Sequence, residues 1–214
     1  MLDPVEAWAR AQLEAKNAAR ERALADSREL IRHCSTSIRA AHRGEFDRAG
    51  ELRDLARRLS EKLTADLAAH QDLYYAGYVQ DAQKEYAEAA ITYALIAGEP
   101  LPGPETLAVS VVSYLGGLAE SVGELRRYIL DQLRQGRMER SEEILARMDE
   151  IYGLLVSLDY PDALTGGLRR ATDSVRGIME KTRGDLTFAL RQRDLEQALA
   201  RVEAGVSRAS APRA

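Results

Sequence analysis

The sequence predicts an all-α protein, a bundle of about six to seven helices. Apolar residues recur at spacings of three and four along most of the chain, which indicates amphipathic helices. The alternation of apolar and polar residues that marks strands is absent from the sequence. A content of 45% apolar and 30% charged residues is typical of a helical protein with one sizeable core. We therefore expect a single domain over residues 1–206 and a disordered tail at 207–214.

The first two predicted helices occupy the first third of the chain. Asp3 is expected to cap the first helix, with Pro4 at its first helical position. This helix continues to Gly44, a residue type that commonly ends helices. The segment 46–70 predicts a second helix, because its large apolar residues fall on one side: Phe46, Leu52, Leu55, Leu59, Leu63 and Leu67.

The remaining helices are separated by glycine and proline. We expect a third helix from Gln71 to Ala97, which the Gly- and Pro-rich stretch 98–104 ends. The segments 106–136 and 137–160 predict a fourth and a fifth helix, and 162–204 supplies one or two more. The fourth segment contains three glycines that would let another backbone or a ligand approach closely: Gly116, Gly117 and Gly123.

Composition excludes several classes of protein. Cys34 is the only cysteine, so an intrachain disulfide cannot form. The chain shows no apolar leader and no uncharged run of the roughly 20 residues that a membrane span requires, and we expect a cytoplasmic protein with no membrane partner. A net charge of −4 gives no overall attraction to nucleic acid, so any such binding requires a local basic surface.

Two pairs of acidic residues stand in apolar helical segments. Glu85 and Glu88 lie in "KEYAEAAITYALI", and Glu120 and Glu124 lie in "GGLAESVGELRR". Each pair shares a helix face, with Cβ atoms about 5–6 Å apart. Neighbouring carboxylates shielded from water cannot all stay charged unaided, and a divalent cation such as Mg²⁺ or Mn²⁺ would remove this cost. The alternative is that both pairs are solvated helix faces, since glutamate is a good helix former.

Other site chemistries find less support in the sequence. The three histidines, His33, His42 and His70, lie far along the chain from both acidic pairs, so a di-iron or zinc site is not expected. A serine or cysteine nucleophile has no evident base, and the lone Cys34 is expected to be a small buried residue.

Four segments together resemble the translin superfamily, and specifically its Trax (translin-associated factor X) branch with the archaeal Trax-like proteins. The resemblance runs from Ser27 to Leu190 and rests on the order and spacing of the segments. They are "SRELIRHCSTSIRAAHRGEFDRA", "YAEAAITYALI", "YLGGLAESVGELRR" and "LDYPDALTGGLRRATDSVRGIMEKTRGDL".

The resemblance implies a seven-helix bundle that assembles into hollow, often octameric, barrels which bind RNA or single-stranded DNA. In the Trax branch it implies an Mg²⁺-dependent endoribonuclease site of four acidic residues that face the interior. These match Glu85, Glu88, Glu120 and Glu124 of this sequence, with Glu120 standing where the Trax branch has Asp. Translin itself lacks the acids, so their presence favours Trax.

A basic surface for nucleic acid has to come from scattered residues. The family's basic, histidine-containing segment before the acidic helix is here "YYAGYVQDAQ", which contains no Lys, Arg or His. Arg126 and Arg127 are the preferred phosphate contacts because they follow Glu124 closely. Taken singly, each candidate also fits a solvated charge on a helix face. The other candidates are Arg28, Arg32, Arg176 and Arg183.

The sequence thus predicts an Mg²⁺-dependent endoribonuclease, with Mn²⁺ as the second candidate ion, whose four glutamates bind the cation directly or through water. The expected partners are single-stranded or partly structured RNA, single-stranded DNA, and further copies of the chain in an octamer. Two alternatives remain open at this point. One is a non-catalytic RNA- or single-stranded-DNA-binding oligomer of the translin type. The other is an all-α nucleoside triphosphate pyrophosphohydrolase, a class that also uses Glu-x-x-Glu helix pairs around Mg²⁺.

Overall fold

The computed structural model describes residues 2–209, with side chains through residue 204, and every regular element in this range is an α-helix. Three of the helices are single turns: α3 (Gln71–Tyr74), α5 (Pro104–Leu107) and α8 (Asp162–Thr165). The bundle itself is built from the long helices α1 (Asp3–His42), α2 (Phe46–Asp66), α4 (Gly77–Ala97), α6 (Val111–Arg134), α7 (Ser141–Ser157) and α9 (Leu168–Ala209). The prediction of an all-α bundle is confirmed.

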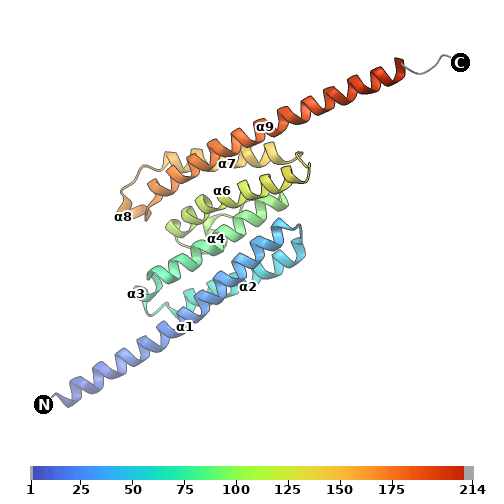
Figure 1. Ribbon diagram of the computed structural model, residues 1–214. Helices are drawn as coiled ribbons and strands as arrows, with labels where there is room; N and C mark the ends of the chain where they lie inside the picture. The colour runs from blue at the N-terminus through green and yellow to red at the C-terminus, as the bar shows by residue number, and fades with distance from the viewer. Residues whose placement is uncertain (1, 210–214) are drawn as a thin grey trace.

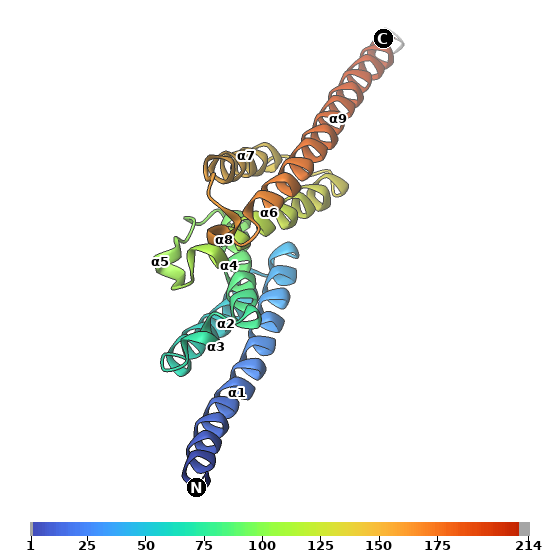
Figure 2. The same ribbon diagram turned by 90° about the vertical axis from the view of Figure 1, so that its left-hand side faces the viewer.

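Helices α4 and α6 form the middle of the bundle. α4 packs against α1, α2 and α6, and α6 also packs against α7 and α9. Figure 1 shows α1 and α2 on one side of this central pair and α7 and α9 on the other. The turned view in Figure 2 shows that the free ends of α1 and α9 project away from the bundle in opposite directions.

The hydrophobic core follows the interfaces of the two central helices. α4 is buried around most of its circumference, which explains why its sequence is an almost unbroken run of apolar residues. Large side chains from every long helix contribute to this core, and the following are buried within it: Leu30, Leu63, Tyr86, Ile91, Leu118, Leu125, Ile144, Met148 and Met179.

Two predicted helix starts are corrected by the structure. The first helix begins at Asp3 itself, with Leu2 in the N-cap position, so the assignment of Asp3 as the cap is wrong. The third predicted helix is broken at Tyr75 and Ala76, where Ala76 is extended, and it forms the separate helices α3 and α4. Gly44, by contrast, ends α1 in the left-handed conformation, as predicted (φ 76°).

The start of α6 and the end of α9 also differ from the sequence-based expectation. Ala108 adopts φ 52° and breaks the fourth predicted helix, and the hydroxyl of Ser110 then caps α6 by accepting the Ser113 amide at 3.1 Å. α9 continues to Ala209, three residues into the expected tail, and residues 210–214 lie outside the described part of the chain. Among the described helices, none combines the length and the hydropathy that a membrane span requires.

Both projecting helix ends carry exposed apolar side chains. More than half of the surface of each of these residues is accessible in the single chain, and such patches mark interaction surfaces. They are Leu2, Val5, Trp8 and Leu13 on α1, and Phe188, Leu195, Leu199 and Val202 on α9.

The two central helices approach each other most closely at Gly117. A Cβ atom built on Gly117 would lie 2.7 Å from the Ala87 Cβ, the Glu88 nitrogen and the Lys84 oxygen, all on α4. Only a glycine fits at this crossing without displacement of the α4 backbone. The expectation that a glycine of this segment allows close backbone approach is confirmed at Gly117, whereas Gly123 has no neighbour within 4 Å.

We predict that Gly117→Ala lowers the free energy of unfolding by about 2 kcal/mol, because the added methyl group overpacks the α4–α6 crossing. Gly123→Ala in the same helix is the matched control, and it should leave stability unchanged or raise it by up to about 1 kcal/mol. Urea titrations of the two variants measure the difference. Equal effects of the two substitutions would contradict a tight crossing at Gly117.

Candidate metal site at the crossing of α4 and α6

Three predicted site residues converge where α4 and α6 cross. One carboxylate oxygen from each of Glu85, Glu88 and Glu120 lies within 4.8 Å of the other two. Glu88 is 9% exposed, whereas the Glu120 side chain is 43% exposed. The cluster of these three glutamates therefore extends from the core to the surface, and the fold joins the two acidic pairs that the sequence places on separate helices.

The local sequence explains this convergence. Glu120 and Glu124 follow Gly117 by three and seven residues, so helical spacing places them on the face of α6 that contains the close crossing. On α4, Glu88 is one of the residues whose backbone meets Gly117. The glycine contact thus sets the distance between the carboxylates of the two helices.

Burial and mutual repulsion disfavour ionisation of the deepest carboxyl group. Burial raises the pKa of Glu88 to about 8, and the charges of Glu85, Glu120 and Glu124 add to this effect. Burial, followed by the charge of Glu120, also raises the pKa of Glu85. Without a bound cation, the cluster retains at least one proton at neutral pH.

One ammonium group partly balances this charge. Lys84 Nζ donates a hydrogen bond to Glu120 Oε1 at 2.6 Å, across the α4–α6 interface. Within residues 2–204 this is the one ion pair between a Lys or Arg side chain and the three clustered glutamates. This contact could not be predicted from helical spacing, because the lysine and the glutamate lie on different helices.

Glu124 lies beside the cluster and has its own partners. His42 Nε2, at the end of α1, is 2.5 Å from Glu124 Oε2, and Arg127 Nη1 lies 3.7 Å from the same oxygen. The hydrogen bond from His42, followed by the charges of His42 and Arg127, lowers the pKa of Glu124 against the effect of burial. The expectation that the histidines lie far from the acidic pairs is wrong for His42, because α1 folds back against the central helices.

The chemistry of the donors fits a hard divalent cation. The cluster offers only carboxylate oxygens, which Mg²⁺ and Mn²⁺ prefer. Cys34 lies on α1 near Glu85 and Glu88, but burial and their charges raise the pKa of its thiol. Within the described residues, the group of donor atoms that could hold an ion contains no cysteine or histidine. The cluster could hold a metal ion.

Of the preferred arginine pair, one member is engaged inside the bundle. Arg126 donates hydrogen bonds to Thr182 at 3.1 Å and to Asp185 at 2.7 Å, and it thereby joins α6 to α9. Arg127 has a side chain that is 55% exposed and lies next to Glu124. Arg127 is therefore the member of the pair that stands at the acidic site.

The other four candidate arginines differ in the partners that they contact. Arg176 and Arg183 lie on α9, and each donates a hydrogen bond to a side chain of α7. Arg28 and Arg32 are exposed on α1, with Arg32 paired to Glu29 on the same helix at 3.2 Å. The α9 arginines link α9 to α7, yet about half of each side chain stays exposed (54% for Arg176 and 55% for Arg183), so arginines of both helices are accessible to a partner.

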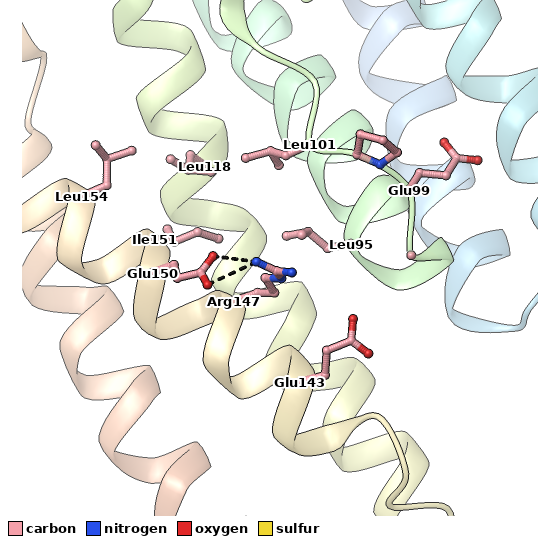
Figure 3. A pocket seen from close by; sticks show the side chains of 11 residues that line it. Leu95, Glu99, Leu101, Leu118, Glu143, Arg147, Glu150, Ile151 and Leu154 are labelled. Atoms are coloured by element: carbon pink, nitrogen blue, oxygen red, sulfur yellow. Dashed lines mark hydrogen bonds and ion pairs between the residues drawn. The ribbon is translucent and has the colours of Figure 1, made fainter.

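An apolar pocket opens on another side of the central helices. Leu95, Leu101 and Leu118 line a cavity of about 340 Å³. Figure 3 shows these side chains together with the Arg147–Glu150 ion pair. None of the four predicted site glutamates lines this pocket. The acidic cluster and the pocket are separate features.

Comparison with known proteins places the chain in a family. No family model matches it. An uncharacterized protein of Methanocaldococcus jannaschii is 32% identical over 195 residues, which cover 90% of this chain and 86% of that protein. The structure of an AfC3PO–duplex RNA complex is 35% identical with a TM-score of 0.78, and the match covers 86% of this chain and 96% of that chain.

Two further structures have the same fold. The crystal structure of AfC3PO is 34% identical with a TM-score of 0.79, over 86% of this chain and 96% of that one. Apo-NeC3PO has the same TM-score of 0.79 at 20% identity, over 88% of this chain and 98% of that one, and this likeness concerns the fold alone. The fold and site define an all-helical protein with a carboxylate cluster at a helix crossing. The chain belongs to the translin/C3PO family, which confirms the predicted resemblance at the family level.

We predict that stability in the presence of chelator falls as the pH rises from about 5 to about 8, by roughly 3 kcal/mol. In this window the folded chain retains the Glu88 proton while the unfolded chain has released it, because the pKa of Glu88 is raised by folding. Folding therefore takes up a proton and becomes less favourable with increasing pH. Glu88→Gln should flatten this dependence in denaturant titrations, and the exposed Glu142→Gln should leave it unchanged. An identical slope in wild type and Glu88→Gln would contradict the buried ionisation.

Proposed function

We propose that the chain is a divalent-cation-dependent endoribonuclease of the Trax branch, with one catalytic domain over residues 1–206. Glu85, Glu88, Glu120 and Glu124 form its metal and catalytic site in this proposal. The observation that carries it is the convergence of three carboxylates at a half-buried helix crossing, where the described residues supply a single ammonium group. Membership of the translin/C3PO family supports RNA as the substrate class.

The four carboxylates differ in the roles they can take. Mg²⁺, or Mn²⁺ in its place, supplies Lewis-acid chemistry when bound, offsetting charge on the phosphodiester and acidifying a water molecule. Glu88 anchors the buried end of the site and Glu120 its open end. Glu124 is held ionised by His42. Glu85 combines partial exposure with a raised pKa, so it is suited to accept a proton from the attacking water.

Exposed arginines on α1 suggest where the RNA backbone lies. Arg28, Arg32 and Arg39 share one exposed side of α1, since they are spaced by four and seven residues, and the exposed Arg43 follows at the C-cap. His42, which contacts Glu124, borders this side. A single strand that contacts these guanidinium groups would lie along the exposed side of α1. AfC3PO has been solved with duplex RNA, so both strand forms are candidate substrates, with single-stranded DNA as a further ligand.

We predict that Glu120→Gln and Glu85→Gln each reduce RNA cleavage at least about a hundredfold, because each removes a ligand and a charge from the site. Labelled single-stranded and duplex RNA, incubated with Mg²⁺ or with chelator, provide the measurement. Glu142→Gln, an exposed change on α7, is the control.

Three outcomes would contradict this function. Normal cleavage by both site variants would displace the catalytic site from the cluster. Salt-sensitive RNA binding by the wild type without cleavage in Mg²⁺ would identify a non-catalytic binder of the translin type. Release of pyrophosphate from nucleoside triphosphates with RNA left intact would identify a pyrophosphohydrolase.

We also propose that the chain assembles into a closed homo-oligomer, an octamer, through the exposed apolar ends of α1 and α9. Leu13 and Leu199 are 66% and 54% exposed in the single chain, which is costly for apolar side chains unless a partner covers them. Sedimentation velocity should show a multimer at micromolar concentration. Leu13→Lys with Leu199→Lys should shift the distribution to smaller species, and a monomeric wild type would contradict the assembly.

A further inference from the structure

Lys84 is held over the acidic cluster by an unusual feature of α6. Its ammonium group donates to Glu120 Oε1 at 2.6 Å, and its side chain is 27% exposed. The hydrocarbon stem crosses α6 at Gly116, where a built Cβ would lie 3.0 Å from both Lys84 Cγ and Cδ. The absence of a side chain at Gly116 gives the stem its space, so Lys84 is placed by packing as well as by charge.

Glu120 consequently has two candidate partners. It is the most exposed of the three clustered glutamates, whose ligand oxygens lie within 4.8 Å of one another, and it is also the acceptor for Lys84. A divalent cation among these oxygens would lie close to the ammonium group and would repel it. The ion pair and a metal–Glu120 contact therefore compete.

We propose that Lys84 is a resident counterion of the cluster, which a divalent cation displaces from Glu120 and which then binds a phosphate of the RNA. This inference rests on the proposed function and adds a regulatory property to the same site. Cation binding alone breaks the ion pair and leaves the ammonium group without a partner. Cation binding together with RNA gives it a phosphate oxygen instead. RNA and the divalent cation therefore strengthen each other's binding through Lys84.

The chemistry of the side chain suits this exchange. A lysine ammonium is a compact charge with three rotatable donors, so it can leave a carboxylate for a phosphate without a fixed geometry. The packing of its stem at Gly116 keeps it beside the cluster after displacement. Binding free energies are reciprocal, so the factor by which RNA raises cation affinity equals the factor by which the cation raises RNA affinity.

The first test is a titration with Mn²⁺ in the absence of RNA. Electron paramagnetic resonance measures the concentration of the free ion. Lys84→Gln should bind Mn²⁺ about tenfold more tightly than wild type, because a competing positive charge is removed. Lys84→Arg retains the charge and should stay within about threefold of wild type. Lys62→Gln is the matched control, since Lys62 pairs with Asp26 of α1 and with Asp66 of its own helix α2.

The second test repeats the titration with a cleavage-resistant oligoribonucleotide that carries 2′-O-methyl phosphorothioate linkages. RNA should tighten Mn²⁺ binding to wild type about tenfold and should tighten binding to Lys84→Gln far less. Gly116→Ala moves the Lys84 stem and leaves every charge in place. Gly116→Ala should shift the Mn²⁺ affinities measured with and without RNA toward those of Lys84→Gln. If Lys84→Gln does not fold, Gly116→Ala provides the test in its place.

The outcomes separate this inference from the proposed function. Equal Mn²⁺ affinity in wild type, Lys84→Gln and Gly116→Ala would overturn the counterion role and leave the metal site intact. Equal RNA enhancement in wild type and Lys84→Gln would overturn the exchange onto phosphate. If wild type and every variant fail to bind Mn²⁺, the proposed metal site fails, and the inference fails with it.

Discussion

The close approach of α4 and α6 at Gly117 is the constraint on which the site depends. With its Cβ position 2.7 Å from α4 atoms, this glycine brings the two backbones together beside Glu88. The same contact buries Glu88 and places Glu120 within reach of both α4 carboxylates. It also sets the distance that Lys84 spans to Glu120. A wider crossing would leave two solvated acidic pairs without a shared site.

The charge balance around this crossing is uneven. The negative charge of Glu124 is compensated by His42 and Arg127, and the negative charge of Glu120 is compensated by Lys84. Glu85 and Glu88 have no such ion pair within the described side chains, and burial raises the pKa of both. The folded chain therefore stores electrostatic strain at its buried end, which a proton or a divalent cation relieves. Strain of this kind accompanies function in many proteins.

Much of the fold could be predicted from local patterns, and part of the site could not. Helical periodicity and Gly44 identify elements because they depend on residues adjacent in the chain. The spacing of Glu85 and Glu88 identifies a shared helix face for the same reason. Which faces meet is a tertiary property, so the contacts of Lys84 and His42 became visible only in the structure.

Anomalous diffraction from crystals of the chain soaked in Mn²⁺ near pH 8, about the pKa of Glu88, measures most directly whether the carboxylate cluster binds a divalent cation. We expect an anomalous peak among the carboxylates of Glu85, Glu88 and Glu120, with the Lys84 ammonium group withdrawn from Glu120. The expected metal site would be contradicted if no anomalous peak lay at the α4–α6 crossing and Lys84 were still bonded to Glu120, while Mn²⁺ was bound elsewhere on the protein.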